Sequence, residues 1–155
     1  MAFQITGLPP QPFEHLFGLD EQQLAAHGVK RVVADEHPGY PCRISLEDAQ
    51  HGESLLLLNF EHLPVDSPYR SRHAIFVREG ARQARPEVDE VPESIARRLL
   101  SVRSFDDEGS MLDADVVEGA SLEPLIERLF KDASATYLHI HNAGRGCFAA
   151  RVDRA

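Results

Sequence analysis

Short segments with the apolar content and residue alternation of β-strands recur along almost the whole chain, and this pattern constrains the fold most. Residues 54–60 carry leucine or phenylalanine on both faces, which predicts a central strand that is covered on both sides. Glycine, proline or acidic turn residues separate the segments. The other predicted strands are residues 3–6, 29–34, 74–78, 100–105, 111–117, 136–141 and 146–152.

Two pairs of predicted strands are joined by loops that are typical of β-hairpins. Residues 106–109 have the sequence Asp-Asp-Glu-Gly, and residues 142–145 have the sequence Asn-Ala-Gly-Arg. Because a hairpin pairs neighbouring strands in opposite directions, we expect a mostly antiparallel sheet.

Helical patterns are fewer. The residues that share one helical face lie three or four positions apart: Leu122, Leu125, Ile126, Leu129 and Phe130. They predict one main amphipathic helix over about residues 121–131, with Ser121 as its N-cap. Asp20 and Gln23 match a capping box for a short helix that ends near Gly28, and further short helices are expected after Ser45 and from Pro92. The predicted fold class is α+β, with residues 1–155 as a single domain.

Composition excludes several classes of protein. The 155 residues are 43% hydrophobic, which is enough for one core, and carry a net charge of −9. A strongly acidic chain does not favour an extended nucleic-acid surface, and no apolar run is long enough to cross a membrane. With two cysteines, no visible signal peptide and an excess of arginine over lysine, we predict a cytoplasmic bacterial protein.

The most informative polar pattern is the histidine-bearing strand at residues 136–141. Tyr137, His139 and His141 share one face, whereas Leu138 and Ile140 point to the other. Two histidines at this spacing can both reach one metal ion or one polar ligand. The available third ligands are His62, His73, Glu61 and Asp113. A half-exposed polar strand face, a ligand pocket and, as a weak alternative, a metal site stay open. No metal or other cofactor is predicted.

A second polar cluster precedes the predicted strand at residues 74–78. Arg70 and Arg72 present forked donors that suit a carboxylate or phosphate, and His73 follows them directly. The alternative is that both arginines form ordinary surface pairs with acids such as Glu61 or Asp66.

A third candidate is the turn at residues 38–43, where two prolines and a glycine are expected to expose Cys42 beside Arg43. A cationic neighbour favours a thiolate nucleophile, but most free cysteines are small buried apolar residues. For Cys147, in the predicted last strand, burial is favoured more strongly. Nucleotide-binding glycine motifs and a Gly-x-Ser-x-Gly elbow are absent.

Several of these segments together resemble a known bacterial family, domain of unknown function 1203. The resemblance rests on residues 3–9 (FQITGLP), 41–49 (PCRISLEDA), 66–70 (DSPYR), 73–80 (HAIFVREG), 137–139, 141–142 and Cys147. It implies a short, stand-alone bacterial protein with no assigned activity. No catalytic residue carries over from the family.

Two functional hypotheses follow. The first is a site on one sheet face that binds, or acts on, a small anionic ligand. Its candidate catalytic residues are His139, His141, His73 and Cys42, and its candidate ligand-binding residues are Arg70, Arg72, Tyr69, Arg43 and Asn142. The second is a non-catalytic interaction module, such as a homodimer whose histidine face packs against a partner.

Overall fold

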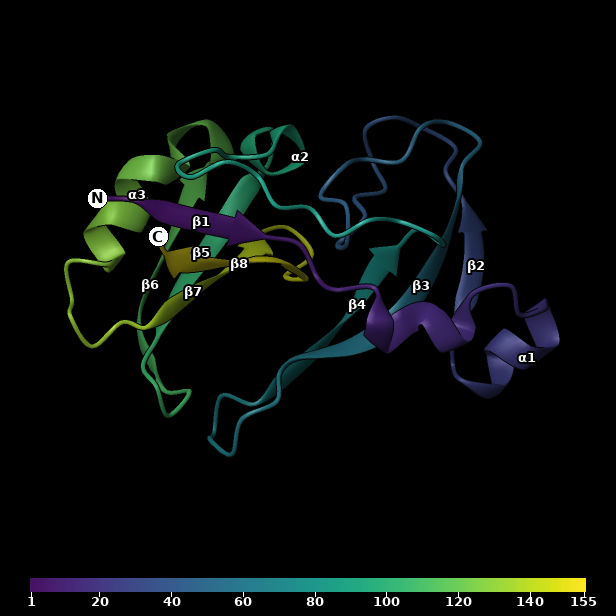
Figure 1. Ribbon diagram of the computed structural model, residues 1–155, viewed down its shortest axis with the longest axis horizontal. Helices are drawn as coiled ribbons and strands as arrows, with labels where there is room; N and C mark the ends of the chain where they lie inside the picture. The colour runs from purple at the N-terminus through teal and green to yellow at the C-terminus, as the bar shows by residue number, and fades with distance from the viewer.

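The computed structural model describes residues 1–155 and consists of two antiparallel sheets (Figure 1). The larger sheet has the strand order β1-β8-β7-β5-β6, and the smaller one has the order β2-β3-β4. The strands are β1 (Phe3–Thr6), β2 (Lys30–Val33), β3 (Ser54–Leu63), β4 (Ser71–Val77), β5 (Leu99–Phe105), β6 (Met111–Glu118), β7 (Tyr137–Asn142) and β8 (Phe148–Arg154). The predicted antiparallel pairing is confirmed, but the strands divide into two sheets instead of forming one.

The helices are all short: α1 (Glu21–Ala26), α2 (Glu93–Ala96) and α3 (Leu122–Leu129), with 3₁₀ helices at Gln11–Leu16 and Gly119–Ser121. The predicted main helix over residues 121–131 is therefore not supported, and the protein is mostly sheet. Ser121 belongs to the preceding 3₁₀ turn and makes no capping hydrogen bond. The capping box of α1 is confirmed, since Asp20 and Gln23 each accept the other's backbone N–H. None of the helices could span a membrane.

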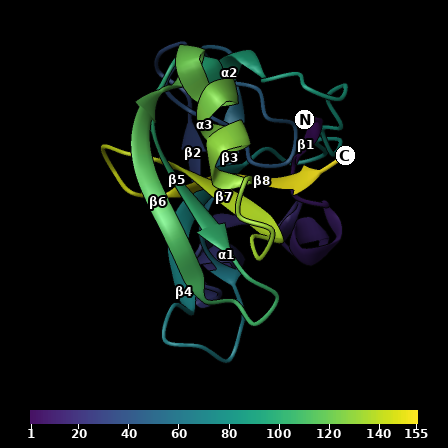
Figure 2. The same cartoon turned by 90° about the vertical axis from the view of Figure 1, so that its left-hand side faces the viewer.

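Helix α3 lies across one face of the five-stranded sheet (Figure 2). Its buried residues Leu125 and Ile126 belong to the same apolar cluster as Leu138 and Ile140 of β7. Because side chains alternate along a strand, the intervening His139 points to the opposite face of the sheet. Packing of the helix therefore decides which way the histidines of β7 point.

The three-stranded sheet has its own apolar cluster, with β3 as its central strand, as the leucines on both faces predicted. Strand β3 continues past residue 60, where it was predicted to end, and β4 begins at Ser71, before its predicted start at residue 74. His62 and His73 are therefore both strand residues. The pairing shifts between Phe60 and Leu63, where β3 contains an irregularity. The added residues of both strands lie beside β7, so the rings of His62 and His73 lie close to that of His141.

Gly7 follows β1, where the chain leaves the five-stranded sheet, and its N–H donates to the Ala84 carbonyl at 3.0 Å. A Cβ at this position would overlap the carbonyl oxygen of Ile44 and lie 3.2 Å from the Ala84 nitrogen. We expect Gly7→Ala to destabilise the protein by about 2 kcal/mol, because backbone has to move. Thermal denaturation should show a fall in Tm of roughly 4–8 °C. Gly144→Ala, which meets open space, is the matched control; equal Tm values for the two variants would contradict the prediction.

Candidate functional site

A pocket of about 450 Å³ lies beside the β7–β8 hairpin, and we call it the Arg43 pocket. The charged and polar side chains that line it are those of Glu36, Arg43, Arg98, Asn142, Arg145 and Cys147. Arg98 is paired with Asp48, but Arg43 and Arg145 against the single carboxylate of Glu36 still make this pocket locally positive. The whole chain, by contrast, carries a net charge of −9. Clefts that carry one sign of charge attract small ions of the other sign.

Arg43 holds the most unusual position in the pocket, because its residue is only 3% exposed. Its Nε donates to the Phe148 carbonyl at 2.8 Å, Nη1 donates to the Pro41 carbonyl at 2.6 Å, and Nη2 donates to Sγ of Cys147 at 3.0 Å. None of these partners is a carboxylate. Burial lowers the pKa of Arg43, because the charged form loses its hydration. A guanidinium nevertheless stays protonated in proteins, so a buried positive charge is left without a counter-ion.

Cys147 is the accessible thiol of the site. It lies in the hairpin just before β8, not within a strand, and it is half-buried. Its sulfur accepts N–H groups from Arg43 at 3.0 Å and from Asn142 at 3.6 Å. Cys42, by contrast, is 1% exposed and accepts the backbone N–H of Arg78 at 3.3 Å. The turn at residues 38–43 packs this thiol into the core, which confirms the interpretation of Cys42 as a small buried apolar residue. The alternative, in which the turn exposes Cys42, is wrong.

The histidines of β7 lie between the two sheets and not on a polar surface. His139 and His141 are 3% and 1% exposed, so the interpretation as a half-exposed strand face is wrong. Two histidines of the smaller sheet lie against them. The ring centroids of His62 and His141 are 4.9 Å apart, and those of His73 and His141 are 6.2 Å apart. Because the chain itself covers this face, it is not available to pack against a partner.

Burial also keeps these imidazoles uncharged. Loss of hydration is the main cause that lowers the pKa of His62 to about 4, of His139 to about 2 and of His141 to about 3. The positive charge of Arg103 lowers all three values further. At neutral pH each ring therefore has one nitrogen with a free lone pair.

The arginines that were expected beside the histidines lie elsewhere. Arg70 makes two hydrogen bonds of 3.1 Å to the carboxylate of Glu61, which is the surface pair named as the alternative. Arg72 donates to Asn59, and it points away from its neighbour His73 because side chains alternate along β4. Tyr69 is 41% exposed and precedes β4. Of the predicted ligand-binding residues, only Arg43 and Asn142 line the Arg43 pocket.

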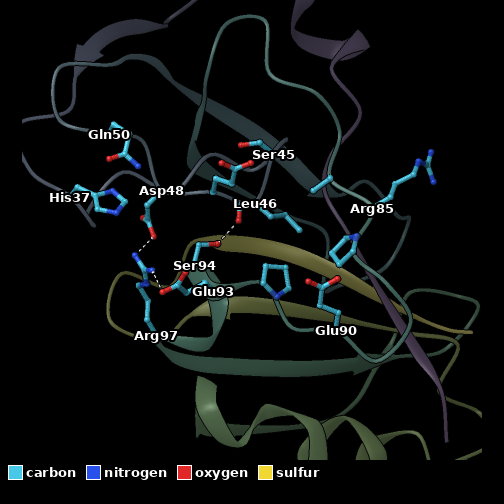
Figure 3. A pocket seen from close by; sticks show the side chains of 14 residues that line it. His37, Ser45, Leu46, Asp48, Gln50, Arg85, Glu90, Glu93, Ser94 and Arg97 are labelled. Atoms are coloured by element: carbon cyan, nitrogen blue, oxygen red, sulfur yellow. Dashed lines mark hydrogen bonds and ion pairs between the residues drawn. The ribbon is translucent and has the colours of Figure 1, made fainter.

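A second pocket, of about 400 Å³, is lined by both acids and arginines (Figure 3). Within it Arg97 donates to Asp48 at 3.1 Å and to Glu93 at 2.9 Å, and Ser94 donates to the carbonyl of Leu46 at 2.7 Å. These charges are already paired with one another. The second pocket therefore does not share the excess positive charge of the Arg43 pocket.

Four residues of these clusters were missed or undervalued from the sequence: Arg98, Arg145, Cys147 and His62. Arg145 looked like an ordinary hairpin turn residue, and Arg98 lies between a short helix and a strand. His62 follows the predicted end of its strand. The glutamate, histidine and leucine at residues 61–63 carried no sign that the strand continues.

The fold and these residues define a class of small, mostly antiparallel β protein with an arginine-lined pocket and a buried histidine cluster. The chain belongs to the family described as Protein of unknown function (DUF1203), whose model matches residues 39–154. The matched range includes Arg43, Cys147 and the four clustered histidines. Comparisons with curated proteins and with solved structures gave no match.

Proposed function

We propose that the protein binds a small anion that carries a carboxylate or phosphate group in the Arg43 pocket. The observation that carries this proposal is the buried guanidinium of Arg43, which has no carboxylate partner within the protein. An unpaired buried charge is costly, and a bound anion would supply the missing counter-charge. Forked guanidinium donors suit the oxygens of carboxylates and phosphates.

The volume of the pocket and its other arginines support a small anionic ligand. A volume of about 450 Å³ falls in the usual range for such sites. Arg145 is exposed on the hairpin and makes no hydrogen bond or ion pair within the protein, so its charge is free for a ligand. Arg98 contributes less, because Asp48 already accepts two of its N–H groups.

An enzymatic form of this proposal would use Cys147 as the nucleophile. The N–H groups of Arg43 and Asn142 that its sulfur accepts would favour the thiolate, after the thiol proton has passed to solvent. The thiolate would attack an electrophilic carbon of the bound anion, and the C–S bond would form as the bond from that carbon to its leaving group breaks. Both cysteines are free, and we propose the reducing cytoplasm of a bacterial cell as the setting in which they stay so.

Binding can be tested by thermal shift with inorganic phosphate and a panel of small mono- and dicarboxylates, followed by calorimetry on the anions that raise Tm. We expect Arg145→Ala to weaken the binding of such an anion about tenfold, because one charge-assisted hydrogen bond is lost. The variant should fold normally, because the side chain of Arg145 makes no hydrogen bond or ion pair within the protein.

The matched control is Arg70→Ala, which removes an exposed arginine outside the pocket and should leave the affinity unchanged. A bound anion should also protect Cys147 from iodoacetamide, whereas Cys42 should react slowly in either state because it is buried. The proposal fails if no anion raises Tm or if Arg145→Ala binds as tightly as the wild type. No binding together with a dimeric native mass would instead favour a non-catalytic interaction module that packs against its partner through a face other than that of the histidines.

A further inference from the structure

A second cluster, separate from the Arg43 pocket, brings together three buried histidines from both sheets. His62 comes from β3, and His139 and His141 come from β7. One ring nitrogen from each lies within 4.8 Å of the other two. In a tetrahedral zinc site with Zn–N bonds of 2.0–2.1 Å, ligand nitrogens lie about 3.4 Å apart. If each side chain rotated so that its ring nitrogen moved by about 1 Å toward the other two, the three nitrogens would reach that spacing.

The ring nitrogens of this cluster lack the partners that buried polar atoms normally have. Both nitrogens of His62 and Nδ1 of His139 are buried without a hydrogen bond. Each unpartnered buried polar group carries an unfavourable free energy of desolvation, so such groups are rare in folded proteins. Aromatic packing against Phe148, whose ring is stacked on His62 with centroids 5.2 Å apart, satisfies neither donors nor acceptors.

The third histidine is already oriented as a metal ligand would be. The Nδ1 atom of His141 lies 2.9 Å from the carbonyl oxygen of Gly146. A carbonyl only accepts, so Nδ1 carries the proton and Nε2 is left with the free lone pair. Metal-binding histidines commonly donate their second ring N–H to a backbone carbonyl in this way, which fixes the tautomer and the ring orientation.

We propose that His62, His139 and His141 form a binding site for one divalent late-transition-metal ion. Three neutral imidazoles suit zinc, copper, nickel or iron and do not suit magnesium or calcium, which prefer oxygen ligands. Three protein ligands also leave a coordination position open, as in catalytic zinc sites. This proposal does not depend on anion binding in the Arg43 pocket.

Two further groups near the cluster influence how it binds a metal. The half-buried His73 lies next to it, with its ring centroid 5.9 Å from that of His62, and is the residue best placed to act as a fourth ligand. Arg103 pairs with His139 across β5 and β7, and its positive charge acts against a cation in the cluster. Because the three ligands are neutral and an arginine lies beside them, we expect the cluster to bind a metal ion with moderate affinity. A strong chelator should therefore remove the metal from the protein.

The test begins with protein stripped by EDTA and titrated with Zn²⁺. We expect one equivalent to bind and Tm to rise by roughly 5–10 °C at a hundredfold excess over Kd. His62→Gln and His141→Gln should each weaken Zn²⁺ binding by about 100-fold. Co²⁺ should give the intense visible absorption of a four- or five-coordinate site in the wild type. The Co²⁺ spectrum also decides the proposal if the variants fail to fold.

Another pair of histidines provides the matched control. The rings of His15 and His27 are 5.7 Å apart on the exposed surface and could hold zinc adventitiously. His27→Gln should leave the stoichiometry, the affinity and the Co²⁺ spectrum unchanged. The proposal is overturned if His27→Gln abolishes binding, if His62→Gln binds as tightly as the wild type, or if neither Zn²⁺ nor Co²⁺ binds.

Discussion

Asp48→Ala is expected to destabilise the protein by about 3 kcal/mol. The side chain of Asp48 is 1% exposed and accepts hydrogen bonds from Arg97 at 3.1 Å and from Arg98 at 2.6 and 3.1 Å. Removing one partner of a buried ion pair leaves the other charges without compensation. The arginine side chains are 26% and 20% exposed, so they keep partial access to water, and this places the effect at the lower end of the range. Urea denaturation at pH 7.5 measures the difference.

Glu93→Ala is the matched control, because Glu93 also pairs with Arg97 but is 87% exposed. An exposed ion pair of this kind contributes at most about 1 kcal/mol, so this variant should stay close to the wild type. If Asp48→Ala lost no more stability than Glu93→Ala, the interpretation of Asp48 as a buried structural ion would be contradicted.

Local patterns predicted the strands because strand formation here depends on features that lie close together in the sequence. The leucines of residues 55–58, the capping box at Asp20 and the hairpin loop at residues 142–145 each specify their own conformation. What local patterns do not encode is which strands share a sheet. That choice depends on contacts between distant segments, such as the pairing of β1 with β8, which joins the two ends of the chain.

The candidate site was predicted less well, for the same physical reason. Alternation along β7 placed His139 and His141 correctly on one face, but whether that face is exposed depends on where the β3–β4 pair lies. Arg70 and Arg72 looked like a binding cluster because they are close in sequence. Their neighbours Glu61 and Asn59, on the adjacent strand, take up those donors.

Arg43 shows what the sequence can and cannot reveal about this pocket. It was selected as a neighbour of Cys42, yet its side chain reaches Cys147, more than one hundred positions further along the chain. A thiol and a guanidinium that meet through tertiary structure have no spacing signature. The pair becomes visible only in the folded structure, where the β7–β8 hairpin packs against the turn at residues 38–43.

Acidification is expected to produce the largest loss of stability, in protein freed of metal. His62, His139 and His141 have folded-state pKa values of about 4, 2 and 3, whereas an unfolded histidine titrates near 6.5. Below pH 6.5 the unfolded chain takes up protons that the folded chain does not, so stability falls as pH falls toward 4. Between the unfolded and the folded pKa values each histidine contributes about 1.4 kcal/mol per pH unit, so the three together contribute about 4 kcal/mol per pH unit.

Because the unfolded histidines are only half protonated at pH 6.5, the total loss is about 4 kcal/mol from pH 7.5 to 5.5 and about 6 kcal/mol from pH 7.5 to 5. A loss of about 6 kcal/mol is comparable to the whole stability of a marginally stable domain, so the metal-free protein should unfold near pH 5. Urea denaturation at pH 7.5, 6.5 and 5.5 measures the slope. The comparison variant is His139→Gln. It leaves unchanged the other charged and titratable groups that influence the rings, which are His73, Arg103, Arg151 and Glu61. Removing one of three titrating rings should reduce the slope by about a third. A stability that stays flat from pH 7.5 to 5.5 would mean that these imidazoles accept protons in the folded protein, and therefore that water or an anion reaches them.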